Sequence, residues 1–260
     1  MQKLFTRTFL NNKFFARKIP VPQAVLLPEI LSEGTEQVII GQGLLKRSEE
    51  FVVLESPILL KTMSSGVVGS GTGWYSTFVN RHVNKDYDCS DHREEMVQYL
   101  RQHGFDPVKT VGMMTAVMLE DVSFKLYQED GFSVFIVVTA GVGNAVDASR
   151  SGQNSYEKSP GTINTWIFVN GELTEEAFIQ SIMTATEAKT KAMHDLEIRD
   201  RLTGTIATGT STDSILIAAA QRGKKLEYAG TITVLGRVIG KGVHECTVNA
   251  IQNSRKRVSK

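Results

Sequence analysis

The stretch Ala207–Ala220, ATGTSTDSILIAAA, says more about the fold than any other part of the chain. Its first half places the hydroxyls of Thr208, Thr210, Ser211 and Thr212 around Gly209, and Asp213 follows them. The apolar run Ile215–Ala220 then predicts a buried strand or the start of a buried helix. The polar cluster therefore lies at the mouth of a core element, where a rigid scaffold can position it for ligand binding. The alternative is a serine/threonine turn in which the aspartate caps a helix.

Two further stretches combine an apolar strand pattern with a glycine-bearing turn. The run Val134–Val138 leads into TAGVGNA at Thr139–Ala145, and PGTIN at Pro160–Asn164 leads into the strand-like Thr165–Val169. Glycine lets the backbone bend or approach a ligand closely, and a threonine or an asparagine stands beside it in each stretch. One such turn is common in any mixed α/β protein. Three of them favour a single small-molecule cleft lined by the turns.

The longest helical pattern begins at Thr174, whose hydroxyl suits an N-cap. One face of this pattern is apolar and comprises Phe178, Ile182, Ala185, Ala192 and Leu196. Lys189 falls within that face, where a lysine either extends its stem toward water or reaches a buried anion. Glu187 falls on the opposite side of the helix.

The rest of the pattern predicts more strands than helices in the first half of the chain. Short strands are expected at Val38–Ile40, Phe51–Leu54 and Ile58–Leu60. The run Val122–Val138 predicts a hairpin, Asp91 can cap a helix through Gln102, and a last helix is expected after Tyr228–Thr231. That last helix would align Ile232, Leu235, Ile239, Gly242 and Cys246 on one face. We therefore expect an α/β protein of the α+β type, a single layered domain with a mixed, largely antiparallel sheet and helices packed on it.

The polar segment His82–His92 has two histidines, three aspartates and a cysteine, so metal binding has to be considered. It contains no HExxH motif and no zinc-type spacing, which favours a solvated loop. The glycine-rich Ser64–Trp74 lacks the Lys-Ser/Thr ending of a phosphate-binding P-loop, which favours a flexible loop. We expect no metal ligands in this chain.

The composition is that of an ordinary globular protein. Of the 260 residues 41% are hydrophobic and 22% charged, and a formal net charge of +1 gives no reason to expect nucleic acid or an anionic membrane as partner. No apolar stretch reaches the length of a membrane span or a signal peptide, and Cys89 and Cys246 lack disulfide or metal-type spacing, so we expect a cytoplasmic protein. The basic tail Arg255–Lys260 is interpreted as a solvated end.

Several motifs occur in one order along the chain. They are VGMMTA at Val111–Ala116, TAGVGNA at Thr139–Ala145, PGTIN at Pro160–Asn164, TEAK at Thr186–Lys189, ATGTSTD at Ala207–Asp213 and YAGT…LG…IG at Tyr228–Gly240. The ordered set resembles the adenosylcobinamide amidohydrolase family of the CbiZ type, from about Ser64 to Gly240. We accordingly assign residues 46–254 to an amidohydrolase domain and residues 1–45 to an N-terminal segment continuous with it.

The resemblance implies a reaction and a set of site residues. The reaction is hydrolysis of the aminopropanol amide of adenosylcobinamide to adenosylcobyric acid, in corrinoid salvage for cobalamin biosynthesis. No cofactor is implied, because the corrin cobalt belongs to the substrate. The candidate catalytic residues are Thr210, Asp213, Lys189, Glu187 and Asn144. The candidate substrate-binding residues are Asn80, Thr139, Gly141, Gly143, Asn164, Thr208 and Thr212, with Asn80 included because the family shows a matching asparagine.

Amide hydrolysis needs an attacking oxygen, a proton acceptor and donors for the oxyanion. A threonine of 208–212 could attack or hold a water, Asp213 or Glu187 could accept the proton, and Lys189 could activate the nucleophile. Asn144 and the backbone of 141–144 could form the oxyanion hole. The alternatives are a non-catalytic corrinoid-binding or sensing protein on the same scaffold, and an amidohydrolase for an unrelated amide. The sequence leaves the oligomeric state open.

Overall fold

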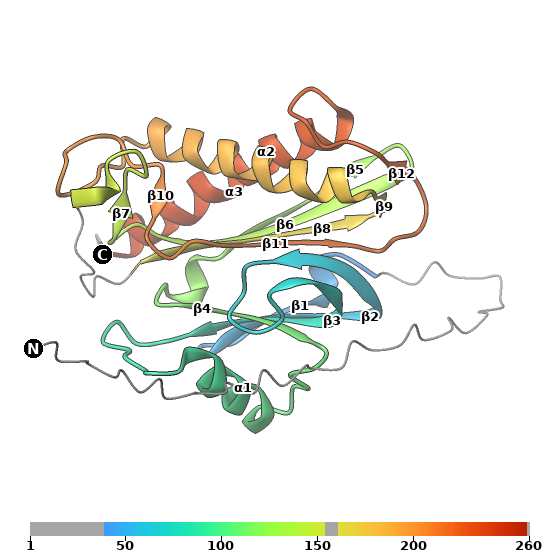
Figure 1. Cartoon of the computed structure of the whole chain (residues 1–260), viewed down its shortest axis with the longest axis horizontal. Coiled ribbons are helices and arrows are strands. Elements are labelled where there is room, and N and C mark those ends of the chain that lie inside the picture. The colour runs from blue at the N-terminus through green and yellow to red at the C-terminus, as the bar shows by residue number, and fades with distance from the viewer. Residues whose placement is uncertain (1–38, 154–160, 259–260) are drawn as a thin grey trace, which may run out of the picture. The chain divides into compact units, whose positions relative to one another are not determined.

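The computed structural model describes residues 39–153 and 161–258, drawn in colour in Figure 1. The chain divides into two units, residues 1–37 and 38–260, and every described residue belongs to the second. That unit is a single α+β domain with a mixed sheet, which confirms the predicted fold class. Among the described residues, no helix is long and apolar enough to cross a lipid bilayer.

The main sheet has eight strands. They are β1 (Leu45–Arg47), β2 (Phe51–Ser64), β3 (Gly71–His82), β4 (Thr110–Thr115), β5 (Ser123–Glu129), β6 (Phe132–Gly141), β8 (Thr162–Asn170) and β11 (Ser214–Ala219). The order is β4-β3-β2-β11-β8-β6-β5, with β1 paired to β2. Among the described strands of this sheet, β3–β4 and β8–β11 are the parallel pairs. The sheet is therefore mixed and largely antiparallel.

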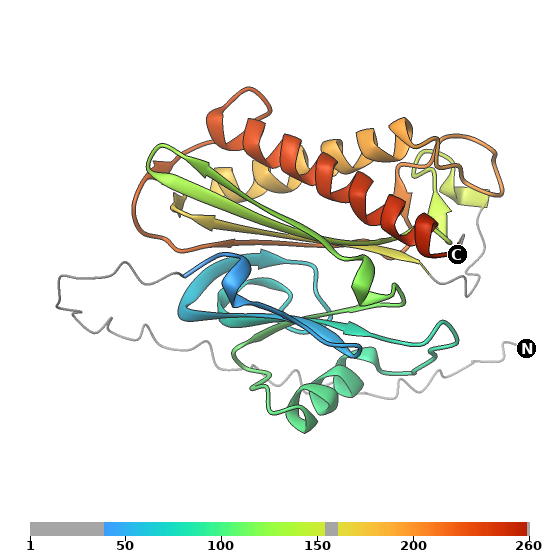
Figure 2. The ribbon, with the colours of Figure 1, turned by 180° about the vertical axis from the view of Figure 1, so that it is seen from behind.

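The sheet folds back on itself to give two layers, as Figures 1 and 2 show. One layer holds β5, β6, β8 and β11, the other holds β1 to β4, and the two meet where β2 pairs with β11. Aromatic rings fill the space between the layers, and Phe78 of β3 meets Phe168 of β8 edge-on with ring centroids 4.9 Å apart. Apolar burial between the layers explains why this long sheet does not remain open.

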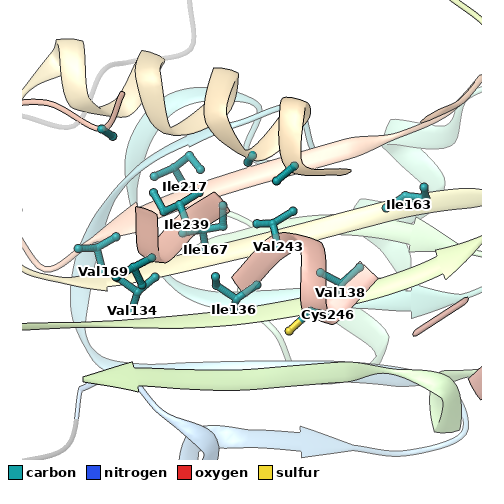
Figure 3. Close-up of a cluster of buried hydrophobic side chains, with 14 of the residues drawn as sticks. Val134, Ile136, Val138, Ile163, Ile167, Val169, Ile217, Ile239, Val243 and Cys246 are labelled. Carbon is teal, nitrogen blue, oxygen red and sulfur yellow. The ribbon is translucent and has the colours of Figure 1, made fainter. Parts of the chain in front are cut away.

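Three α-helices cover the outer faces of the two layers. Helix α1 (His92–Gln102) packs on β2 and β3 through Met96 and Leu100, and Asp91 caps it as predicted by accepting a hydrogen bond from the Glu94 amide. Helices α2 (Glu175–Asp195) and α3 (Val234–Val258) lie over the other layer. Figure 3 shows their core, where Ile136, Ile167 and Ile217 of the strands pack against Ile239 and Val243 of α3.

Short elements complete the domain. Strand β7 (Ala145–Val146) pairs with β10 (Gly209–Thr210), and β9 (Glu172–Leu173) pairs with β12 (Lys225–Leu226). The 3₁₀ turns are η1 (Gln42–Leu44), η2 (Leu119–Asp121) and η3 (Ser151–Gln153). The β7–β10 pair ties the turn after β6 to the turn before β11.

The structure corrects several predicted elements. Phe51–Leu54 and Ile58–Leu60 are two parts of the single strand β2, because a bulge between Glu55 and Leu60 accommodates Pro57 without ending the strand. Ile39 and Ile40 are buried but not in a strand, and Val38 lies outside the described residues. The hairpin Val122–Val138 is confirmed as β5–β6.

The two long helices also differ in part from the prediction. Helix α2 begins after Thr174, whose hydroxyl accepts the Ala177 amide, as predicted. Helix α3 starts only at Val234, so Ile232 precedes it and is 86% exposed instead of sharing the buried face with Leu235. Helix α3 is also the longer of the two, with 25 residues against 21.

Candidate active site

The predicted glycine-bearing turns meet at one edge of the sheet. Strand β6 ends where β8 begins, since the two are antiparallel and Gly141 pairs with Thr162. Strand β11 runs parallel to β8 and begins at the same edge, with Ser214 opposite Asn164. The run Ile215–Ala220 therefore belongs to a buried strand, and the alternative in which Asp213 caps a helix is wrong. One sheet edge gathers residues that lie about 70 positions apart in the chain.

The carboxylate of Asp213 is the centre of this edge. Its Oδ1 accepts hydrogen bonds from the Thr210 hydroxyl at 2.5 Å and from the Ile163 amide at 3.0 Å. Its Oδ2 accepts from the Lys189 ammonium at 2.5 Å and from the Thr210 amide at 3.2 Å. Four donors from three segments hold one carboxylate in a fixed orientation, which is the preorganisation that catalytic groups require.

Lys189 reaches this carboxylate from α2. The side chains of Lys189 and Asp213 are 15% and 19% exposed, so the ion pair lies just below the surface. Lys189 lies on the apolar face of the helix, where its side chain could extend toward water or reach an anion. The structure shows that it reaches an anion. Gly209 lies directly beneath the pair, and a Cβ at this position would overlap both Asp213 Oδ2 and Lys189 Nζ.

Asn144 joins the turn after β6 to the turn before β11. Its amide Nδ2 donates to the Ser211 hydroxyl at 2.8 Å, while its Oδ1 is buried and has no partner among the described residues. The Thr212 hydroxyl donates to the Gly161 carbonyl at 2.7 Å. Gly161 leaves no room for a side chain, because a Cβ there would overlap Asn144 Oδ1. Asn144 thus stands next to the Thr210–Asp213 turn, and its role in catalysis stays a prediction.

Thr208 is part of the framework of the site. Its hydroxyl accepts the Ala148 amide at 3.1 Å, and its carbonyl accepts the Thr190 hydroxyl of α2 at 3.0 Å. Nearby, hydrogen bonds from Ser149 and Thr205 hold the pKa of Asp147 below its usual range. These contacts fix the loops on both sides of the β7–β10 pair.

The predicted binding residues Asn80, Thr139 and Asn164 do come together, but inside the molecule. Asn80 Nδ2 donates to Thr139 Oγ1 at 2.9 Å, and Asn164 Nδ2 donates to Asn80 Oδ1 at 2.8 Å. They are 3%, 1% and 2% exposed, respectively. This polar network connects the two sheet layers next to the edge that carries Asp213, since Asn164 pairs with Ser214. Its position suits a support for the candidate site. Their contact with a ligand stays a prediction.

Glu187 is not brought to this cluster. It is exposed on the other side of α2, where it lines a groove of about 620 Å³ between α2 and α3 together with Lys191 and His244. The helical phase of the sequence had placed Lys189 and Glu187 on opposite sides, and the structure agrees.

Side chains in and near the His82–His92 segment contact other parts of the chain. His82 Nδ1 is 2.9 Å from the Val117 carbonyl oxygen, and Glu95 of α1 accepts from Arg81 and from Tyr87. Burial would raise the pKa of Glu95, but these hydrogen bonds outweigh it and lower the pKa. Within residues 39–153 and 161–258, no three His, Cys, Asp or Glu side chains are grouped as metal ligands.

A cavity of about 750 Å³ opens beside the glycine turns. Gly141, Gly143 and Gly161 form part of its wall, and a role of Gly141 and Gly143 in substrate binding stays a prediction. Its rim carries Lys85 and Arg201, which sequence analysis did not single out, and Arg255 and Arg257 of the tail that was interpreted as a solvated end. They come from three distant segments of the chain, and no motif connects them.

The chain is similar to known proteins over most of its length. A family model described as adenosylcobinamide amidohydrolase matches residues 36–259. A protein of Methanosarcina mazei named adenosylcobinamide amidohydrolase is 26% identical over 192 residues, which cover 70% of this chain and 86% of that protein. An uncharacterized protein of Methanocaldococcus jannaschii is 37% identical over 188 residues, covering 65% of this chain and 70% of that one.

A longer relative comes from Bacillus subtilis. It is described as an uncharacterized ABC transporter ATP-binding protein and is 27% identical over 235 residues. The match covers 90% of this chain but only 43% of the Bacillus protein, so this chain spans less than half the length of that relative.

Proposed function

Because the chain belongs to the adenosylcobinamide amidohydrolase family, we propose that it cleaves the amide between aminopropanol and the corrin ring of adenosylcobinamide. The products are adenosylcobyric acid and aminopropanol, and the reaction serves corrinoid salvage for cobalamin biosynthesis. The observation that carries the proposal is the Thr210–Asp213–Lys189 array. Thr212 of the same turn donates to the carbonyl of Gly161, which lines the cavity. The cobalt is part of the substrate, and the proposed mechanism uses no metal or cofactor of the protein.

In this mechanism Thr210 supplies the attacking oxygen. Its hydroxyl already donates a hydrogen bond to Asp213 Oδ1, which is the geometry required for proton transfer to a general base. As the Thr210 oxygen bonds to the amide carbon, its proton passes to Asp213. Lys189 holds the carboxylate in position from the far side, through Oδ2.

The second half of the reaction returns the proton. When the carbon–nitrogen bond breaks, the proton on Asp213 passes to the departing amine, which leaves an ester on Thr210. Water then attacks the ester carbon while Asp213 takes a proton from it. That proton passes to the Thr210 oxygen as the ester bond breaks, which releases the acid and restores the hydroxyl. The turn Gly141–Asn144 is the proposed source of oxyanion donors, since Asn144 places it against Ser211. Asp213 is the proposed base in preference to Glu187, which lies on the other side of α2.

The experiment must separate an enzyme from a corrinoid-binding protein on the same scaffold. Purified protein is incubated with adenosylcobinamide, and mass spectrometry follows adenosylcobyric acid and aminopropanol. Equal amounts of the two products, formed over many turnovers, would support the proposal. Tight binding of adenosylcobinamide with no product would favour the binding protein, and hydrolysis of other amides alone would identify a different amidohydrolase.

A further inference from the structure

The rim of the cavity beside the glycine turns is positively charged. Four basic side chains line it, namely Lys85, Arg201, Arg255 and Arg257, and none of the described residues that line it is acidic. The formal charge of the whole chain is only +1, so this concentration of one sign is local. A concave surface lined by one sign of charge focuses the field and attracts ligands of the opposite sign.

The four cations have different surroundings. Arg255 and Arg257 lie in the last turn of α3, where the helix dipole favours positive charge, and Arg257 is paired with Asp121 and Glu120. Lys85, in the loop after β3, and Arg201, in the loop after α2, are neither at a helix end nor in an ion pair with a described residue. Within residues 39–153 and 161–258 neither of these two has an ion-pair partner. Two unpaired cations from separate loops therefore face one cavity.

The cavity also borders the proposed chemistry. Gly161 lines the cavity, and its carbonyl accepts the hydroxyl of Thr212, which belongs to the same turn as Thr210 and Asp213. Amide hydrolysis at this turn converts a neutral amide into a carboxylate. A new negative charge would thus appear next to a cavity whose free charges are positive.

We propose that this cavity is an oxyanion-binding subsite, which takes a carboxylate or a phosphate borne by the corrinoid ligand. Lys85 and Arg201 bind the oxyanion, while Arg257 stays with Asp121 and holds the end of α3 in place. The subsite favours the acid product over the amide substrate. That a corrinoid carries the oxyanion rests on the proposed function, whereas the preference for an oxyanion rests on the cavity alone.

Equilibrium binding tests the subsite without any need for turnover. All titrations use the Thr210→Val background, so that the amide is not consumed, and the probes are adenosylcobyric acid, adenosylcobinamide and inorganic phosphate. We expect the acid to bind more tightly than the amide at low ionic strength, with the difference shrinking as salt is added. Arg201→Gln and Lys85→Gln should each weaken binding of the acid by about threefold to tenfold, the range for an exposed charge-assisted contact.

Arg222→Gln is the matched control, because Arg222 is exposed in the loop beyond the far end of β11 and does not line the cavity. If Arg201→Gln weakens binding of phosphate but not of the acid, the subsite is supported, and the oxyanion that it binds is a phosphate and not a carboxylate. Equal affinities for acid and amide, unchanged by salt, by Arg201→Gln and by Lys85→Gln, would overturn the inference. Failure of hydrolysis with a retained preference for the acid would overturn the proposed function alone.

Discussion

Replacing Asp213 by asparagine removes the charge at the centre of the site while keeping its shape. If the asparagine Oδ1 takes the place of the aspartate Oδ1, it still accepts from Thr210 Oγ1 and the Ile163 amide. The new NH₂ group then faces Lys189 Nζ and the Thr210 amide, which are both donors. Two charge-assisted hydrogen bonds are lost, one of them also an ion pair, which for a partly exposed group costs about 2–3 kcal/mol of unfolding free energy. The melting temperature should fall by roughly 5–10 °C.

The loss in turnover should be larger than the loss in stability. Removing a positioned general base costs about 10²–10⁴-fold in kcat, or about 3–5 kcal/mol of barrier. Hydrolysis of adenosylcobinamide is measured well below the melting temperature, together with substrate affinity. Asp195→Asn is the control, because Asp195 also pairs with a lysine of α2, Lys191, and with His244, but away from the site. A folded Asp213→Asn protein with a kcat within about threefold of the Asp195→Asn value would refute the reasoning.

Three further changes test the same site. Lys189→Met should fold, since methionine suits an apolar helix face, yet its kcat should fall by about 10²-fold or more. The control Lys191→Met, on the same helix, should keep normal kinetics. Similar rates for the two variants would show that Lys189 has only a structural role. Gly209→Ala should lower kcat by about tenfold or more, because the new Cβ displaces the Lys189–Asp213 pair, and a crystal structure with that pair unmoved would contradict this. Exhaustive chelation should leave hydrolysis unchanged, and abolition with rescue by one divalent ion would show a metal requirement.

Local pattern was enough to predict much of the fold. The alternation in Val122–Val138 predicted the β5–β6 hairpin, and the hydroxyl of Thr174 predicted the start of α2. Strand β2 was predicted as two strands because Pro57 normally ends a strand, and a bulge that tolerates it depends on the partner β3. The residue at which a helix begins was less predictable. Ile232 was expected on the buried face of the last helix but is exposed and precedes α3.

The site was predictable only where a single segment carries the information. Helical phase placed Lys189 inward, but its partner Asp213 depends on how α2 lies over β11. The bond from the Ile163 amide to Asp213 depends on the parallel pairing of β8 with β11, which no local pattern shows. Lys85 and Arg201 come to line one cavity only when the chain folds, so the sequence held no signal for that cavity.

The most direct test of the account compares two threonine-to-valine variants. Thr210→Val removes the proposed attacking oxygen, and Thr186→Val removes an exposed hydroxyl that donates to the Ile182 carbonyl of its own helix. Single-turnover hydrolysis of adenosylcobinamide and its dissociation constant are measured for both. The account predicts that Thr210→Val binds adenosylcobinamide as well as Thr186→Val does but hydrolyses it at least about 10²-fold more slowly. Hydrolysis by Thr210→Val within about twofold of the Thr186→Val rate would contradict the central claim.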